Sequence, residues 1–486
     1  MPASSGGTAA DARLARQRLA LRSKLASLRN EVDAWTKMPK APGFAIHTSQ
    51  IEDVCGGLAR LHQLIEKEID DAEQENMLTA EAIVGFERKS LAALQIWECY
   101  RDKLSLRLVP SLREALALVD DLAWEAYRPA RDRAHDNGTV DATALREPPL
   151  VFPNTRWSPF ARSREQRYEL DETTGNWDAF ADLEEWLRAL PVPLIGIPWY
   201  QMCHLPDAVF IGHEVGHLVE EDLGLDEALR KAIGDVLPQD GDDAVTKRRI
   251  AWTRHWRSEV FADVYGVLTT GPAYARILVD ALHGDDVSGE VQPDAARSTG
   301  HEWSAYPTRM LRALVVFEAV HLLPDPESTG SFVREASALK TAWVSTYPQH
   351  AMAEYEDDVP RVVRAILETP LTAFAPKKGY PAAPLTKVFP FSPNMHKHAT
   401  EDAANALARR PVLASDTREL FAGVALAFLT DPAKYASVNA QKRFRDRLLK
   451  TRDERVRNVV AIKLKTEDRL ARQQAVGARL FKKMQA

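Results

Sequence analysis

Residues 209–219, VFIGHEVGHLV, constrain this chain more than any other stretch, because they place three ionisable side chains in an almost wholly apolar segment. An apolar helix of this kind belongs in a core, where ionisable groups are costly unless they have partners. His213 and His217 are four residues apart, so on a helix they project from one face, one turn from each other. Two imidazoles in that arrangement can bind one metal ion, which would offset the cost of burial. We therefore predict a metal site on this helix, with Glu214 beside it.

The pattern His-Glu-x-x-His is typical of the zinc-binding helix of metallopeptidases. Catalytic zinc sites use three protein ligands and leave a fourth position to water, so a third ligand is required. In the metzincin arrangement, a glycine would follow three residues after His217 and a histidine three residues beyond that glycine. Glu220 and Leu223 occupy these two positions, which excludes that arrangement.

A second apolar helix supplies a carboxylate that can serve as the third ligand. It carries Glu259 and Asp263, which lie one turn apart on the same face. Both acids are explained if Glu259 binds the metal and Asp263 accepts a hydrogen bond from a ligating imidazole, that of His213. The alternative is a buried ion pair of these acids with Arg254 or Arg257. We favour the metal interpretation, because it accounts for both helices together.

The sequence H-E-V-G-H at 213–217, followed by E-V-F-A-D at 259–263, resembles the gluzincin class of zinc metallopeptidases. The resemblance implies a zincin-like α+β catalytic domain with a small sheet, a Zn²⁺ cofactor and a protein or peptide substrate. The matching motifs cover residues 206–270. The implied roles are zinc ligands for His213, His217 and Glu259, general base for Glu214, and an orienting contact to a ligand for Asp263.

Hydrolysis of a peptide bond also requires a donor to the oxyanion that forms in the tetrahedral intermediate. His301, Tyr306 and Arg309 are the candidates, since they lie between a long polar loop and the next helix. Of the three we favour Tyr306, with His301 as a further catalytic candidate.

Four other residues near the motifs have metal-binding side chains. They are His204, His255, His283 and Cys203. A single histidine is more often a packed or exposed residue than a ligand, although His255 could contact a ligand from one turn before Glu259. A buried, unreactive side chain is the favoured interpretation for Cys203, over a thiolate that approaches the metal.

The composition is that of an ordinary soluble protein of two to four domains, with 486 residues, 45% hydrophobic and 27% charged. A net charge of −6 implies no bulk affinity for nucleic acid or anionic membranes. Three cysteines do not make a disulfide framework. The sequence begins without a signal-peptide pattern, and no stretch approaches the roughly 20 apolar residues of a membrane span. We expect a cytoplasmic protein without a membrane partner.

The first part of the chain is predicted to be mainly α. In residues 1–136, apolar side chains alternate in gaps of seven, four and three from Leu14 to Trp35, and three further amphipathic helices follow. This pattern indicates a helical bundle or antiparallel coiled coil that serves as a scaffold or binds a protein partner. Residues 137–178 are rich in proline, glycine and polar residues and are predicted to connect the bundle to the next domain.

Residues 179–369 are predicted to form the catalytic domain, beginning with a short helix at 178–190. The proline-bounded segment 192–200 is expected to be an edge strand or an extended segment. An edge strand beside the metal helix could bind substrate by strand addition.

The last part of the chain divides into a predicted linker and a helical region. Residues 370–399 contain six prolines between 370 and 393 and are expected to form an extended linker or a surface arm. Residues 400–486 are predicted to be a basic helical region, with fifteen basic and five acidic residues in 442–483. Such a run could contact nucleic acid, but a solvated helix face is the favoured interpretation.

These observations leave two functional hypotheses. The favoured hypothesis is a zinc endopeptidase in which Glu214 acts on a zinc-activated water. The other is a non-enzymatic helical scaffold or nucleic-acid-binding protein whose metal site is structural or vestigial. The presence of Glu214 favours the enzyme, because a structural metal site needs no base at that position.

Overall fold

The computed structural model of the chain describes residues 9–38, 44–154, 160–161, 190–239, 243–283, 306–347, 353–456 and 466–485. The described part is mainly helical with one small sheet, so the predicted mainly α class is confirmed. Within it, no helix has both the length and the apolar character that crossing a membrane requires. The helix predicted at 178–190 lies outside the described residues except for its last position.

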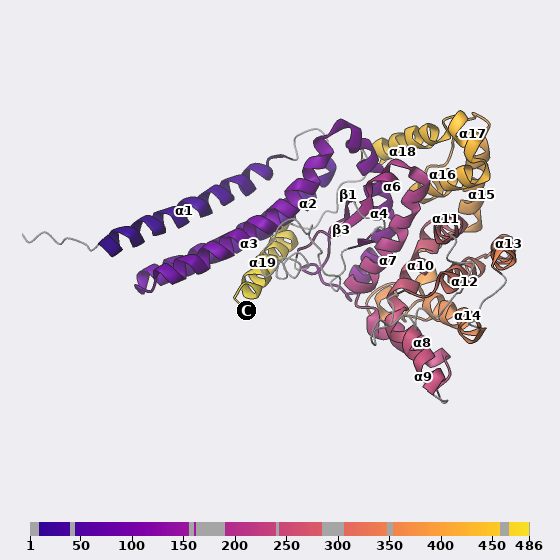
Figure 1. Cartoon of the computed structure of the whole chain (residues 1–486), viewed down its shortest axis with the longest axis horizontal. Helices are drawn as coiled ribbons and strands as arrows, with labels where there is room; N and C mark the ends of the chain where they lie inside the picture. Colours follow the sequence, from indigo (N-terminus) through magenta and orange to yellow (C-terminus); the bar gives the residue numbers. More distant parts are fainter. Residues whose placement is uncertain are drawn as a thin grey trace, which may run out of the picture.

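Four helices form an elongated arm at one end of the molecule (Figure 1). These are α1 (Ala9–Trp35), α2 (Thr48–Gln74), α3 (Ala80–Ser105) and, from the far end of the chain, α19 (Thr466–Lys483). The seam predicted along the first helix is buried at Leu21, Leu25 and Val32. The arm is thus a helical bundle whose core is completed by a segment more than 350 residues away in sequence.

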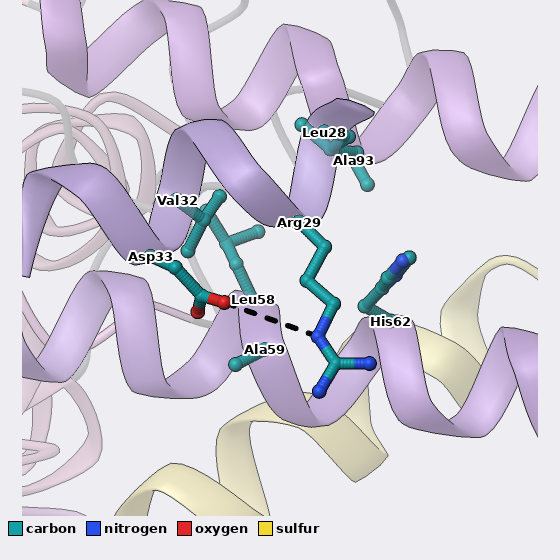
Figure 2. Close-up of a pocket in the computed structure, with 8 residues that line it drawn as sticks. All are labelled: Leu28, Arg29, Val32, Asp33, Leu58, Ala59, His62 and Ala93. Carbon is teal, nitrogen blue, oxygen red and sulfur yellow. Dashed lines mark ion pairs between the residues drawn. The ribbon is translucent and has the colours of Figure 1, made fainter. Parts of the chain in front are cut away.

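Helices α1, α2 and α3 meet around a small, mainly apolar pocket (Figure 2). Leu28, Val32 and Leu58 line it, together with the buried side chain of His62. Burial lowers the pKa of His62, because desolvation disfavours the charged imidazolium. The neutral histidine and its apolar neighbours make this pocket a packing feature of the arm.

A three-stranded sheet joins the arm to the rest of the molecule. Its strands are β1 (Leu150–Asn154), β2 (Phe160–Ala161) and β3 (Leu194–Pro198), in the order β1-β3-β2. Strand β3 pairs in parallel with β1 and antiparallel with β2. The prediction of an edge strand here is wrong: β3 is the central strand, because Pro193 and Pro198 fall at its ends and leave the interior residues free to pair. Strand β3 is therefore not available for strand addition.

Side chains on the two faces of this sheet enter two different cores. Leu150 and its partner Leu194 pack into the arm. Val151 and its partner Ile195 pack into the larger core. Because successive residues of a strand point to opposite faces, one short sheet ties both cores together.

The larger core, called here the central core, is built almost entirely from helices. In chain order these are α4 (Pro110–Asp136), α6 (Trp199–Cys203), η5 (Leu205–Phe210), α7 (Ile211–Asp222), α8 (Asp226–Val236), η6 (Ala251–His255), α10 (Arg257–Thr270), α11 (Pro272–Leu282), α12 (Arg309–His321), α13 (Ser331–Thr346), α14 (Ala353–Glu368), α15 (Pro393–Leu407), α16 (Thr417–Thr430), α17 (Pro432–Ser437) and α18 (Ala440–Val456). Helix α9 (Asp243–Ile250) has no buried residue and packs against η6 outside this core. Helices α7 and α10 lie side by side near its centre (Figure 1).

The packing does not follow the domain boundaries predicted from the sequence. Helix α4, placed in the 1–136 bundle, packs against α7 in the central core, and α19 leaves the 400–486 region to join the arm. The predicted 370–399 linker is not a free linker, since Phe374, Phe389 and Phe391 are fully or almost fully buried in the central core. The segment folds back on itself through a bridge between Leu371 and Ala383, with two short 3-10 helices, η9 (Thr372–Phe374) and η10 (Leu385–Lys387), and the burial of its aromatic side chains fixes it in place.

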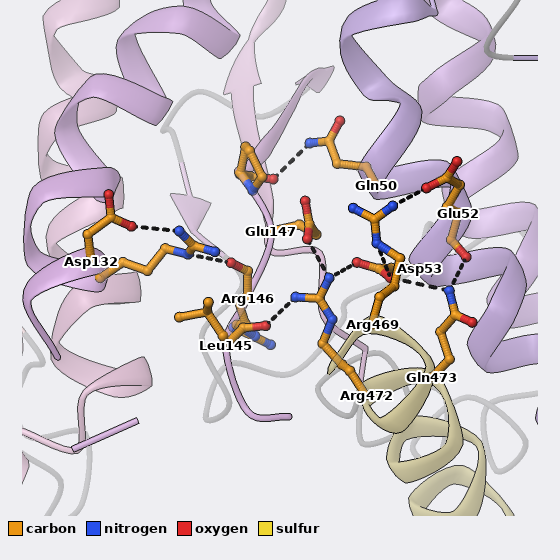
Figure 3. Close-up of polar contacts among 12 residues, drawn as sticks. Gln50, Glu52, Asp53, Asp132, Leu145, Arg146, Glu147, Arg469, Arg472 and Gln473 are labelled. Atoms are coloured by element: carbon orange, nitrogen blue, oxygen red, sulfur yellow. Dashed lines mark hydrogen bonds and ion pairs between the residues drawn. The ribbon is translucent and has the colours of Figure 1, made fainter. Parts of the chain in front are cut away.

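Helix α19 is fastened to the arm by a buried ion cluster that consists of Asp53, Glu147 and Arg472 (Figure 3). The Arg472 guanidinium pairs with Asp53 of α2 and lies 2.5 Å from Glu147, which precedes β1. It also donates a hydrogen bond of 2.7 Å to the carbonyl oxygen of Leu145. The side chain of Arg472 is completely buried, so α19 supplies the positive charge that compensates the buried carboxyl groups of Asp53 and Glu147.

Candidate metal centre

Helix α7 presents two histidines to one point inside the central core. Residues 211–220 are buried, in agreement with the apolar character of this segment. The imidazoles of His213 and His217 stand nearly perpendicular, at 87°, with ring centroids 4.8 Å apart. Their Nε2 atoms lie 3.2 Å from each other. The Nε2 atoms of both rings therefore face the same point in the core.

Glu259 reaches this point from α10. The two helices approach closely at Gly216, where a Cβ atom would lie 2.8 Å from the Cα of Ala262. Glu259 Oε2 lies 3.2 Å from His213 Nε2, and Glu259 Oε1 lies 3.6 Å from His217 Nε2. The ligand atoms of all three side chains fall within 4.8 Å of one another. Among the described residues, His213, His217 and Glu259 form the group of side chains whose ligand atoms lie close enough together to hold a metal ion.

Behind His213, the carboxylate of Asp263 forms a dense set of contacts. Asp263 Oδ1 lies 2.9 Å from His213 Nδ1, which is the contact predicted from the sequence. The same oxygen accepts hydrogen bonds of 2.8 Å from Tyr274 and from Arg312 Nη2, and Arg312 Nε donates to Oδ2 at 2.8 Å. Although burial opposes ionisation, Arg312 and His213 hold the pKa of Asp263 well below its usual range. Asp263 is thus an acceptor, and His213 Nδ1 carries the proton.

Behind His217, a serine hydroxyl takes the equivalent place. His217 Nδ1 lies 3.0 Å from Ser258 Oγ, and that hydroxyl donates to Glu220 Oε2 at 2.5 Å. Since the single hydroxyl proton points to Glu220, Ser258 Oγ accepts from His217 Nδ1–H. Both histidines therefore direct an Nε2 lone pair towards Glu259.

This arrangement fits a cation. The Nε2 atoms of both histidines and the carboxylate of Glu259 converge on one buried point, and each Nε2 atom would present a lone pair there when its imidazole is neutral. Although burial opposes the imidazolium, Asp263 and Glu259 raise the pKa of His213 to about 10, and Glu259 likewise raises the pKa of His217. Although burial favours its neutral form, the two histidines hold the pKa of Glu259 far below its usual range. The site attracts positive charge, and a divalent ion bound by neutral imidazoles would supply it.

The predicted base and oxyanion donors take up different positions. Glu214 is buried on α7, and its charge, together with burial and Glu259, raises the pKa of Tyr306. Tyr306 is 41% exposed, and its ring lies 5.3 Å from the guanidinium of Arg312. Arg309 is exposed at the start of α12. His301 lies outside the described residues.

The remaining candidates are not brought to the site. Cys203 is exposed on α6, so the expectation that it is buried is wrong. His204 lies 3.1 Å from Asp207, and His283 contacts Tyr347. His255 is half-buried in η6.

The predicted alternative, an ion pair of the acids with Arg254 or Arg257, is not observed. Arg257 donates to Glu220 at 2.8 Å and also pairs with Asp226. The arginine that pairs with Asp263 is Arg312, which the sequence reasoning missed.

A signal for Arg312 was present in the sequence. It is a charged residue within the apolar helix 309–321, the same anomaly that identified Glu259. Tyr274, Ser258 and Glu220 were also missed as partners of the histidines. Their roles depend on how helices α7, α10 and α11 pack, and no spacing rule predicts that packing.

In comparisons with protein-family models, curated proteins and solved structures, nothing matches this chain. The metal centre is therefore argued from its own geometry.

Proposed function

We propose that this protein is a zinc-dependent peptidase that hydrolyses peptide bonds in a protein or peptide substrate. The observation that carries the proposal is the convergence of the two Nε2 atoms and the Glu259 carboxylate, with the carboxylate of Glu214 buried on the same helix. The interpretation of the central core as a zincin-like catalytic domain is part of the same proposal.

His213, His217 and Glu259 would hold the zinc ion. When bound, zinc acts as a Lewis acid that polarises the scissile carbonyl and lowers the pKa of a coordinated water towards about 7. Imidazole nitrogen and carboxylate oxygen are ligands that suit zinc, and three protein ligands leave a position open for substrate and water.

Glu214 would act as the general base. It follows His213 directly, so its side chain leaves the helix about 100° from that ligand and faces the same buried region. It would accept a proton from the attacking water and later give it to the leaving amine. A structural metal site would not require a buried carboxylate at this position.

Tyr306 would donate a hydrogen bond to the developing oxyanion. Burial and the charges of Glu259 and Glu214 raise its pKa, which keeps the hydroxyl protonated and able to donate. Its side chain is partly exposed, so a substrate could reach it from the solvent. His301 remains a candidate for the same role.

The decisive experiment separates metal binding from catalysis in the full-length protein. Metal analysis after zinc loading should give about one zinc per chain, and His217→Ala should lose it. Glu214→Gln should keep the zinc and lower cleavage of a proteome-derived peptide mixture by about 10²- to 10⁴-fold. Glu227→Gln, an exposed change on α8, is the control and should alter neither property. Full cleavage by Glu214→Gln would refute the mechanism.

A further inference from the structure

A chain of buried polar contacts extends from His217 away from the proposed metal position. His217 Nδ1 lies 3.0 Å from Ser258 Oγ, Ser258 Oγ lies 2.5 Å from Glu220 Oε2, and Arg257 Nε donates to Glu220 Oε1 at 2.8 Å. Arg257 also pairs with Asp226 at the start of α8. The chain therefore runs from the ligand to the surface through α7 and α10.

Each link in this chain has a partner, which is required because the chain is buried. The side chain of Glu220 is only 7% exposed, and a buried carboxylate is costly unless it is paired. The guanidinium of Arg257 compensates its charge. Glu220 is then free to accept the Ser258 proton through its other oxygen.

The consequence for His217 is a fixed tautomer. A serine hydroxyl has one proton and two lone pairs, so when the proton points to Glu220 the oxygen can only accept from His217. The proton of a neutral His217 must then sit on Nδ1, and Nε2 offers its lone pair to an ion held beside Glu259. If Ser258 lost its acceptor, the hydroxyl could turn round and donate to Nδ1, which would favour the tautomer that cannot bind a metal through Nε2.

We propose that Ser258 and Glu220 are positioning residues that hold His217 as an Nε2 metal ligand, as Asp263 does for His213. The inference rests on the proposed metal centre. The two histidines therefore have different supports: the carboxylate of Asp263 contacts His213 directly, and the hydroxyl of Ser258, held by the carboxylate of Glu220, contacts His217. In sequence these positioning residues extend the two motifs to H-E-x-x-H-x-x-E and S-E.

The test measures zinc affinity of the full-length protein by competition with a chromophoric chelator. Ser258→Ala should weaken zinc binding by about 10- to 100-fold, the usual loss when a group that orients a ligand is removed. Glu220→Gln, which keeps the shape of the side chain, should also weaken binding, because an amide cannot accept from both Ser258 and Arg257. Ser437→Ala, an exposed serine of α17, should bind zinc as the unmodified protein does.

A second measurement separates positioning from a merely structural role. The visible spectrum of the Co²⁺-substituted protein should change in both variants, because the ligand field depends on how His217 is oriented. The free energy of unfolding without metal is measured alongside, because Glu220→Gln also removes the charge that pairs with Arg257. A variant that loses stability but binds zinc with unchanged affinity would overturn the proposal.

The result also distinguishes this inference from the proposed function. If the unmodified protein binds zinc and Ser258→Ala binds it equally well, the positioning role is refuted and the metal centre stands. If the unmodified protein binds no zinc, both are refuted. If positioning holds but Glu214→Gln retains full cleavage, the metal site exists and the peptidase mechanism is wrong.

Discussion

The metal centre and the ion cluster that fastens α19 both bury carboxylates, but they compensate the charge in different ways. In the ion cluster the guanidinium of Arg472 lies between Asp53 and Glu147, so the chain supplies its own cation (Figure 3). In the proposed metal centre, the guanidinium of Arg312 is bound to Asp263, behind His213, and forms no ion pair with Glu259 among the described contacts. The first cluster is closed, and the second would take its cation from solution if the proposed function is correct.

The ionisation behaviour of the ion cluster agrees with this distinction. Burial and the charge of Glu147 raise the pKa of Asp53 to about 8, while Arg472, despite burial, keeps the pKa of Glu147 low. One proton and one guanidinium then balance two carboxyl groups. Such a cluster needs nothing from solution, and we interpret it as structural.

The largest effect is expected from removing the internal cation. Arg472→Met should lower the free energy of unfolding by about 3–5 kcal/mol, because it leaves two buried carboxyl groups without their cation. Denaturant unfolding in the presence of a chelator measures this loss. Lys482→Met, an exposed change on the same helix, should have little effect. If Arg472→Met also abolished zinc binding, the two clusters would not be independent and the comparison would fail.

The next effect is expected from supplying the external cation. Zinc at about 100 times its dissociation constant should raise the free energy of unfolding by about 2.7 kcal/mol, because it binds only the folded site. Thermal unfolding with zinc and with chelator measures the difference. The increase should persist in Arg472→Met and vanish in His217→Ala. An increase that survives in His217→Ala would place the zinc elsewhere.

Much of the fold could be predicted where a pattern is local. Apolar spacing predicted the seam of α1, which is buried at Leu21, Leu25 and Val32. What failed depends on distant contacts. The central position of β3 requires pairing with β1 and β2, and the docking of α19 requires charges from Asp53 and Glu147 that lie hundreds of residues away.

The site could be predicted only as far as charges stand out against apolar sequence. His213, His217, Glu259 and Asp263 lie in apolar helices, so their burial and their need for partners are visible in the sequence. Ser258 gives no such signal, because an uncharged hydroxyl occurs both in cores and on surfaces. Its role depends on the approach of α7 and α10, which the structure shows and spacing does not.

That approach can be tested with glycine substitutions in the two regions. At Gly477 a Cβ atom would lie 2.9 Å from the backbone nitrogen of Leu61, and at Gly216 it would lie 2.8 Å from the Cα of Ala262. Alanine at either position should lower the free energy of unfolding by about 1–3 kcal/mol, because the backbone must move. Only Gly216→Ala should also weaken zinc binding, as measured by chelator competition.

Gly85 provides the matched control for these substitutions. It is also helical, and a Cβ atom there would meet nothing within 4 Å. Gly85→Ala should stabilise the protein by about 0.5–1 kcal/mol, since alanine favours a helix. If Gly477→Ala weakened zinc binding as much as Gly216→Ala, the arm and the metal centre would be coupled.

The last effect, whose size depends on the pH interval, is expected from titrating the closed cluster. The pKa of Asp53 is about 8 in the folded protein, and the ordinary value of 3.8 applies in the unfolded chain. Between pH 3.8 and about 8, the folded state therefore holds a proton that the unfolded state has released. The stabilisation is complete below the lower value and is lost as the pH rises through the higher one. The free energy of unfolding should therefore fall by at most about 1.4 kcal/mol per pH unit from pH ~5 to ~8.

Asp53→Asn, which cannot titrate, should show a flatter pH dependence of the free energy of unfolding, measured by denaturant unfolding with chelator. The difference between the two proteins cancels the titrating groups that do not interact with Asp53, including the histidines of the metal centre. Asp71→Asn, exposed on the same helix, should follow the unmodified protein. Equal slopes for all three proteins would show that Asp53 shares no proton with Glu147, and the cluster would then carry an uncompensated negative charge.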